Sequence, residues 1–218
     1  MENKKINYKI VSPKIPKKLD EFQSFDEDIQ NDDFFEMRVI SDCCIENQTA
    51  EHVNFKQMIF RNVIFKQIAF KGLDLTDVRF ENCDLSNVDF NEAIIHRVEM
   101  IDCKMMGIDL SESTLQNVKF GNCNGRYASF AFSRCKQVNF ENCLLRNADF
   151  QESDFNKVAF VESDLQQVEM PGTKLKGIDL SDCEIDGINV RTTDLYGVIV
   201  SPIQAVSLSR LLGLVIKN

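Results

Sequence analysis

Cysteine and histidine are the first candidates for chemistry in this chain, because they form most metal sites and all disulfides. The chain has eight cysteines and two histidines, His52 and His96. Six cysteines fall on one twenty-residue grid: Cys43, Cys83, Cys103, Cys123, Cys143 and Cys183. That spacing matches no zinc motif, and Cβ atoms stacked at the strand spacing lie too far apart for a disulfide. We therefore expect buried, inert thiols and no metal site; Cys44 and Cys135 lie off the grid and are the ones to test for reactivity.

No other constellation of residues indicates catalysis. The sequence has no glycine-rich phosphate loop, no nucleophile motif, and no histidine placed to serve as a base. We expect a protein that is not an enzyme and that has no cofactor.

The elements that position these residues follow a period of five. Large apolar residues recur at every fifth position from Phe55 to Val200, interrupted only at Gly125 and Cys135. A smaller residue stands two positions before each of them. The predicted core ladder includes Phe80, Phe120, Phe140, Phe160, Cys83, Cys103, Cys123 and Cys143. A period of five fits neither a helix nor a free strand, so it indicates a repeat architecture.

The twenty-residue columns indicate that four units of five make one turn. The simplest solid is an all-β, square-sectioned parallel β-solenoid, with large residues on its axis and coils about 4.8 Å apart. About seven and a half coils then form a rod roughly 36 Å long. The beat extends back weakly through Phe35, Ile40 and Ile45.

The five-residue units also carry a resemblance. Cys83-Asp-Leu-Ser-Asn87, Ala148-Asp-Phe-Gln-Glu152 and Ser163-Asp-Leu-Gln-Gln167 resemble the A(D/N)LXX motif of pentapeptide-repeat proteins. The resemblance covers about two-thirds of the chain and implies a right-handed quadrilateral parallel β-helix. It is much less specific for function, because the motif occurs in proteins of many roles.

Both ends depart from the repeat, which gives three expected segments. Residues 1–33 contain a lysine- and proline-rich stretch and then an acidic one, and we expect an extended segment and cap; a mobile arm is the alternative. Residues 34–200 form the β-helix. Residues 201–218 predict a short C-terminal α-helix, with Ser201 as N-cap, Pro202 at the first position and Gly213 past the end, followed by a short strand over Leu214–Ile216.

The C-terminal segment carries more apolar side chains than one coil end can bury, so we expect a homodimer through this module. A monomeric cap is the alternative. The predicted interface consists of Ile203, Val206, Leu208, Leu211, Leu212, Leu214 and Ile216. The stretch Ser201-Pro-Ile-Gln-Ala205 followed by the leucine-bearing helix and Gly213-Leu-Val-Ile216 is similar to the C-terminal module of Qnr/MfpA-type quinolone-resistance proteins. The proline-containing N-terminus and the stretch Tyr127-Ala-Ser-Phe130 are similar to Gram-positive members. The unbroken repeat leaves no room for the projecting loops of many Gram-negative members, so the resemblance is to the loop-free ones, and loop-dependent protection is not expected.

Charge is distributed unevenly over the faces of the predicted rod. The face that carries Phe90, Leu110, Phe130 and Phe150 gathers carboxylates, whereas the next face gathers lysine and arginine. The candidate partner-binding residues are Asp89, Glu92, Asp109, Glu112, Asp149, Glu152 and Glu169. The aspartates belong to the general motif and can serve solubility alone, but the glutamates are not demanded by it. Near Ser129 the carboxylates stop, and Tyr127 and Phe132 stand at outward positions, as a partner site or as repacking over Gly125.

These features predict a binding protein. The net charge of −9 argues against direct binding of DNA or of an anionic membrane, and no apolar run approaches a membrane span, so we expect a cytoplasmic protein. A narrow acidic rod, about 70 Å long as an end-to-end dimer, resembles duplex DNA. The resemblance implies a DNA mimic that binds DNA gyrase, and also topoisomerase IV, and protects against quinolones. A scaffold for an unrelated partner, or an immunity protein against a gyrase-targeting toxin, are the alternatives.

Overall fold

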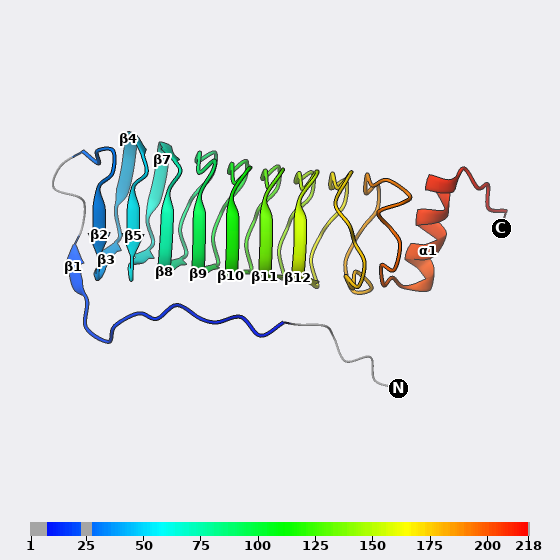
Figure 1. Ribbon diagram of the computed structural model, residues 1–218, viewed down its shortest axis with the longest axis horizontal. Helices are drawn as coiled ribbons and strands as arrows, with labels where there is room; N and C mark the ends of the chain where they lie inside the picture. The colour runs from blue at the N-terminus through cyan, green and yellow to red at the C-terminus, as the bar shows by residue number, and fades with distance from the viewer. Residues whose placement is uncertain (1–7, 23–27, 218) are drawn as a thin grey trace.

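The five-residue step of the chain originates at its corners. Every fifth residue from Asp32 to Gly177 has a positive φ, and the left-handed conformation turns the backbone from one side of a square coil to the next. Asn, Asp and Gly tolerate this conformation best, and they occupy many of these positions. The computed structural model describes residues 8–22 and 28–217, and its coils stack into the long body of Figure 1.

The strands lie along the sides of these coils and pair in parallel. From β2 onward, paired residues are twenty positions apart, as Leu115 is from Cys135 and Phe120 from Phe140. The expected all-β, quadrilateral parallel β-helix with a short C-terminal helix is therefore confirmed. The elements are β1 (Asp20–Phe22), β2 (Phe34–Glu36), β3 (Arg38–Ser41), β4 (Cys44–Glu51), β5 (Asn54–Lys56), β6 (Ile59–Arg61), β7 (Ile64–Lys71), β8 (Asp74–Glu81), β9 (Ile94–Ile101), β10 (Thr114–Gly121), β11 (Arg134–Glu141), β12 (Asp154–Val161), α1 (Pro202–Leu208) and the 3₁₀ helix η1 (Ser209–Leu212).

The core is a set of side-chain ladders along the axis of the rod. Phe140 stacks between Phe120 and Phe160, with ring centroids 4.7 and 5.0 Å away and nearly parallel planes. Phe80 is buried in the same column. At Gly125, Leu145 Cδ2 lies 3.0 Å from the place that a Cβ would take, so a neighbouring leucine fills the gap in the large-residue beat. The solenoid thus buries one continuous hydrophobic core, coil on coil.

The thiols lie between these large residues and are free. Cys83, Cys103, Cys123 and Cys143 are buried, and each directs its Sγ at the carbonyl oxygen of a residue in the preceding coil. Of the two cysteines singled out for a test of reactivity, Cys135 is buried on the axis, and burial raises the pKa of its thiol to about 12, so it is not a reactive thiol. Cys44, in contrast, is exposed.

The N-terminal part covers the first coil and then follows the rod. β1 pairs in parallel with β3, and the side chain of Ile29 is buried in the hydrophobic core. Residues 8–19 run in extended form along the outside of the coils (Figure 1). The first coil begins at β2, which pairs with β5, and Ile40 and Ile45 are already buried. The rest of the expected N-terminal segment, residues 1–7 and 23–27, lies outside the described residues.

The C-terminal helix covers the other end of the rod. Ser201 caps α1, because its Oγ accepts from the Gln204 N–H while Gln204 Oε1 accepts from the Ser201 N–H, which confirms the expected N-cap. The last turn tightens into η1 and ends at Gly213, with φ of 73°. The expected strand over Leu214–Ile216 is wrong: these residues pair with no strand, because α1 rather than an open strand edge covers the last coil.

Candidate partner-binding face

One side of the rod collects carboxylates without any cation between them. We call it the acidic face and define it as residues 88–92, 108–112, 128–132, 148–152 and 168–172. Backbone bridges join Asp89 to Asp109, Asp109 to Ser129, Ser129 to Asp149, and Asp149 to Glu169, so these residues form one column. None of the residues in this face is lysine or arginine. The structure therefore brings the seven sequence-predicted carboxylates together on one side.

The aspartates of the acidic face have a structural role as well as a charge. Asp89, Asp109 and Asp149 each accept a hydrogen bond from the backbone N–H two residues on, at 3.0, 2.8 and 2.8 Å. Asp84 and Asp164 make the same contact on another face, so this interaction belongs to the geometry of the coil. One carboxylate oxygen of each aspartate is thus used to shape the turn.

The glutamates stand at the corner of the acidic face and make no such contact. At one end Lys71 Nζ lies 2.9 Å from Glu92 Oε1, and at the other Arg191 Nη2 lies 2.7 Å from Glu152 Oε1. Both cations belong to coils outside the acidic face as defined. Glu112 lies between these two pairs, is exposed, and has no ion-pair or hydrogen-bond partner for its carboxylate in the part of the chain that the structure describes.

Stacking carboxylates in this way costs stability. Two unit charges one coil apart, about 4.8 Å, repel each other by roughly 1 kcal/mol in water. Glu169 relieves part of this by accepting a hydrogen bond from the Asn189 side-chain amide. The left-handed corner accepts uncharged residues equally well, so the fold does not require Glu92, Glu112 or Glu152 at these positions. The exposed ion pairs of Glu92 and Glu152 contribute at most about 1 kcal/mol each.

A second face carries carboxylates that the sequence analysis did not single out. Residues 78–82, 98–102, 118–122, 138–142 and 158–162 form it, and we call it the ion-paired face. Here cations stand among the acids: Arg79 Nη2 lies 3.0 Å from Glu99 Oε2, and Lys119 Nζ lies 2.7 Å from Glu141 Oε2. Two cations stand among the five carboxylates of this face, so it is less negative than the acidic face, which has seven carboxylates and no lysine or arginine.

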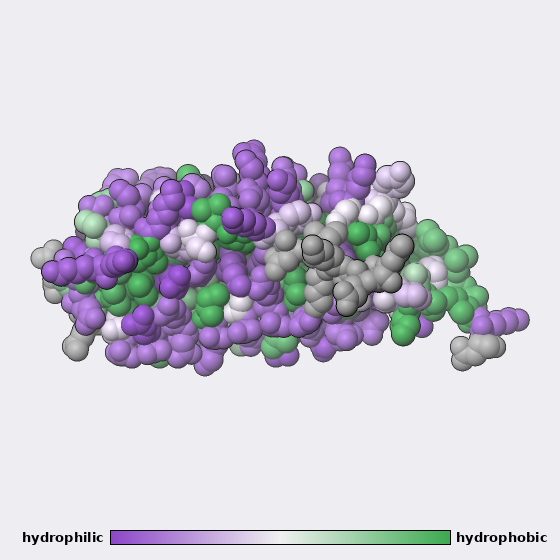
Figure 2. All heavy atoms as spheres, turned by 90° about the horizontal axis from the view of Figure 1, so that it is seen from below, coloured by the Kyte–Doolittle hydropathy of each residue, from purple (hydrophilic) through white to green (hydrophobic). Residues whose placement is uncertain are grey.

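The C-terminal module presents apolar side chains to solvent. Ile203, Val206, Leu211, Leu212, Leu214 and Ile216 are exposed, Ile203 by 82%. Apolar side chains gather at this end of the molecule in Figure 2. Leu208 differs from the rest of the predicted interface, because it is partly buried and packs against the hydrophobic core of the rod. The larger part of the predicted set therefore shares one open surface.

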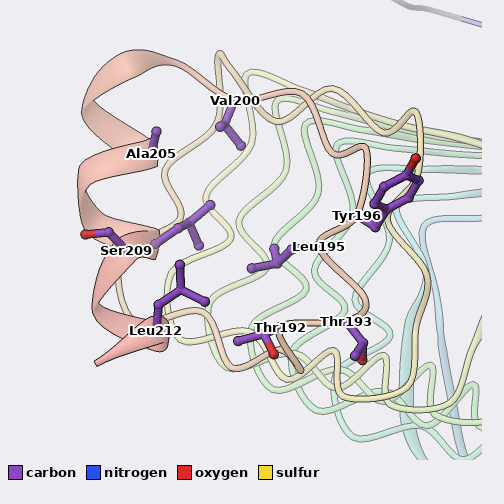
Figure 3. A pocket seen from close by; sticks show the side chains of 9 residues that line it. Thr192, Thr193, Leu195, Tyr196, Val200, Ala205, Ser209 and Leu212 are labelled. Atoms are coloured by element: carbon purple, nitrogen blue, oxygen red, sulfur yellow. The ribbon is translucent and has the colours of Figure 1, made fainter. Parts of the chain in front are cut away.

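An apolar groove of about 700 Å³ separates the last coil from the helices. Thr192, Leu195, Tyr196 and Val200 line it from the coil, and Leu212 lines it from η1 (Figure 3). The Tyr196 side chain is 76% exposed at its rim. The groove extends the open apolar surface of the C-terminal module back onto the rod.

Comparison with known proteins decides the family. The model of the pentapeptide repeat region matches residues 73–150 and 133–203, which together are more than half of the chain. The chain belongs to the pentapeptide-repeat family. No curated protein matches its sequence.

Several solved pentapeptide-repeat structures are similar to the chain. Full-length QnrB1, a plasmid-mediated fluoroquinolone resistance protein, is 16% identical with a TM-score of 0.41, over 81% of this chain and 100% of QnrB1. HetL, which is involved in heterocyst differentiation regulation in the cyanobacterium Nostoc sp. strain PCC 7120, is 11% identical with a TM-score of 0.40, over 78% of this chain and 87% of HetL. At these identities and TM-scores neither assigns an activity to this chain.

The pentapeptide-repeat rod also holds its own N-terminal arm, residues 8–19, by contacts that the sequence analysis missed. The Lys14 N–H donates to Asp77 Oδ1 at 2.8 Å, and the Val11 N–H donates to Asn117 Oδ1 at 3.2 Å. The amides of Gln57 and Gln137 donate to arm carbonyls at 3.0 and 3.3 Å. The sequence offers one signal for this contact, a column of polar side chains at twenty-residue spacing: Gln57, Asp77, Arg97, Asn117 and Gln137.

Asp77 is the most buried charge under this arm. Its side chain accepts from Arg97 Nη2 at 2.7 Å as well as from the arm. Burial acts to raise the pKa of Asp77, but the hydrogen bonds from Arg97 and from the Lys14 N–H outweigh it and hold the pKa below its usual range. The carboxylate is therefore ionised at neutral pH and ties the arm to the coil.

The described residues include no group of three or more His, Cys, Asp and Glu side chains that is arranged to hold a metal ion. Among the helices of residues 8–22 and 28–217, none has the length and apolar character needed to cross a bilayer.

Proposed function

We propose that this pentapeptide-repeat protein is a binding protein, not an enzyme, whose acidic face takes the place of DNA on a type II topoisomerase. The partner would be DNA gyrase, and also topoisomerase IV, in the cytoplasm. The observation that carries the proposal is a column of seven carboxylates in four of five successive coils, with no lysine or arginine among them. A DNA-binding channel is lined with cations, so a narrow acidic rod fits its charge and its shape.

The C-terminal module supports the second half of the proposal, a homodimer. Several apolar side chains of the module are exposed next to one another, which is more than scattered single residues on a protein surface. A two-fold partner would bury them. Two rods joined end to end present about 70 Å of acidic surface, comparable to a stretch of duplex. The similarity of this module to that of Qnr/MfpA-type proteins agrees with the same arrangement, and it extends the proposal to protection against quinolones.

A supercoiling assay with purified gyrase, with and without ciprofloxacin, tests the proposal. We expect the protein to inhibit supercoiling or to restore it in the presence of the drug. The triple variant Glu92→Gln, Glu112→Gln and Glu152→Gln should need about tenfold more protein for the same effect, because it removes three charges from the corner of the acidic face. No effect of the wild-type protein on gyrase at any concentration would remove the proposal.

A structural scaffold for an unrelated partner is the second candidate. The hydrogen bonds of Asp89, Asp109 and Asp149 to their own turns favour it, because these carboxylates have a purpose within the coil. A pull-down with the wild-type protein and the triple variant separates the two candidates. A scaffold should recover the same non-topoisomerase partner with both proteins, whereas the DNA mimic should recover gyrase subunits with the wild type alone.

A further inference from the structure

Two aromatic residues stand at consecutive corners of one coil, on either side of the acidic face. Tyr127 and Phe132 have φ of 61° and 59°, and their side chains are 61% and 53% exposed. Among the residues with positive φ in the described part of the chain, they are the only tyrosine and the only phenylalanine. Every corner from Asp32 to Gly177 is left-handed, so the exposed rings, and not the backbone, set these two corners apart.

The fold of the chain itself gives no reason for these rings. Leu145 already fills the space at Gly125, so the rings do not compensate for the missing side chain. In the described part of the chain, neither ring stacks on another aromatic ring or under a cation, unlike Phe34 beneath Lys56. Tyr127 and Phe132 therefore expose apolar surface without a ring or cation contact among the described residues.

The surroundings of Phe132 indicate what would contact it. The Glu112 N–H donates to the Ala131 carbonyl at 2.8 Å, and the Phe132 N–H donates to the Gln151 carbonyl at 2.9 Å, so these corners stack in register. Glu112 and Phe132 have φ of 58° and 59°, and they project from the same edge about one coil, roughly 4.8 Å, apart. Glu112 is also the corner glutamate that has no ion-pair partner within the described residues.

Between the two corners the side chains at the surface of this coil are small. Ser129 takes the place that Asp109 and Asp149 hold in the neighbouring coils, and Ala131 is small and buried. The two rings thus border a shallow uncharged step, with carboxylates one coil above and below it. An aromatic surface beside an unpaired carboxylate is the environment that a guanidinium group prefers, because it stacks on rings and pairs with carboxylates at once.

We propose that Tyr127, Phe132 and Glu112 form the anchoring site of the acidic face and receive an arginine side chain of the protein partner. The inference rests on the proposed function. It adds a specific short-range contact, which imitation of a DNA duplex by charge alone does not require. Long-range charge orients the rod, whereas an aromatic anchor paired with arginine supplies short-range affinity, as such residues do at the centre of protein interfaces. The partner is therefore recognised as a protein, not only as a positive channel.

Substitution by asparagine tests the anchor without unfolding the coil. Asparagine is the residue best suited to a left-handed corner, so Phe132→Asn and Tyr127→Asn should keep or raise the melting temperature. Binding to immobilised gyrase holoenzyme should nevertheless weaken about tenfold or more for Phe132→Asn. Gln67→Asn is the matched control: it lies in the same corner column as Tyr127, is exposed with φ of 52°, carries no ring, and should bind like the wild type.

A double-mutant cycle with Glu112→Gln tests whether ring and carboxylate hold the same arginine. We expect the two single losses to be clearly non-additive in the double variant, because either change removes part of one site. Wild-type affinity of Phe132→Asn, or strictly additive losses, would overturn the anchoring site and leave the proposed function intact. Failure of the wild-type protein to bind gyrase would overturn both.

Discussion

Carboxylates in this rod have three different roles, and their immediate neighbours decide which. Asp109 accepts from the backbone of its own turn, Asp77 is buried against Arg97 and the arm, and Glu112 is exposed without a partner in the described structure. Residue type alone does not separate these roles. The first two carboxylates stabilise the coil or the arm, and the third leaves its charge available to a partner.

Asp77→Ala should detach the arm. The change removes the acceptor of the Lys14 N–H and leaves Arg97 without its carboxylate, at a cost of about 1–3 kcal/mol for a buried group left unsatisfied. Limited trypsin digestion should then cleave after Lys14 much faster than in the wild type, with the rod intact. Equal cleavage rates would show that Asp77 does not hold the arm.

The same contact predicts a pH dependence with a definite sign. Because the pKa of Asp77 is lower in the folded than in the unfolded chain, its contribution to stability is present above the ordinary carboxyl range, near pH 4, and is lost as pH falls through the folded pKa. Urea unfolding of the wild type and of Asp77→Asn should therefore differ at pH 7 and converge toward acid pH. A difference that grows as the pH falls would contradict this assignment.

Phe140→Ala tests the core ladder. The ring is fully buried between Phe120 and Phe160, so its removal leaves a cavity on the axis and two unstacked neighbours. We expect a loss of about 3–5 kcal/mol in the free energy of unfolding, measured by urea titration. A loss below about 1 kcal/mol would mean that the coils around Phe140 collapse onto the space.

At the scale of elements, the two ends of the rod behave differently. At the N-terminal end, β1 covers the first coil and the arm follows the outside of the rod. At the C-terminal end, α1 and η1 cover the last coil and expose apolar side chains on their outer side. Gln204 fixes the helix to the rod, because its amide donates to the carbonyls of Leu180 and Cys183 at 2.7 Å each. A helix held this firmly presents its outer side chains in a defined geometry, as a dimer interface requires.

Ile203→Asp should convert a dimer into a monomer. Its side chain is 82% exposed on the first turn of α1, so the change disturbs no internal packing but places a charge in the proposed interface. Light scattering coupled to size-exclusion chromatography measures the mass directly. Ile64→Asp, at an exposed apolar position on β7, is the control and should leave the mass unchanged. A monomeric wild-type protein would contradict the dimer.

The sequence predicts the coil far better than it predicts what lies on it. The five-residue repeat follows from the alternation of core residues and left-handed corners. Core positions select large apolar residues, and corners favour Asn, Asp and Gly, so both can be recognised in the sequence. The arm could not be placed in the same way: the polar column marks a surface that can bind something, but Asp77 and Asn117 bind the arm through its backbone, which looks the same in any sequence. The pairing of Glu92 with Lys71 likewise depends on side-chain reach across coils, which spacing alone does not reveal.

At the scale of the whole molecule, charge and shape act together. The acidic face meets cations only at its two ends, where Lys71 pairs with Glu92 and Arg191 pairs with Glu152. The ion-paired face carries cations among its acids, and the apolar end offers a way to double the length. A chain with a net charge of −9 repels DNA, so any link to DNA-binding enzymes must run through their basic surfaces. The central claim is that the acidic face occupies the surface on which such an enzyme holds duplex DNA.

Displacement of labelled duplex DNA from gyrase tests this claim most directly. A fluorescent duplex bound to the gyrase holoenzyme is titrated with the wild-type protein and with the triple glutamine variant at positions 92, 112 and 152, at low and at physiological salt. The account predicts that the wild type releases the duplex, more effectively at low salt, and that the variant is about tenfold weaker. Binding of the protein to gyrase with the duplex still in place would contradict it.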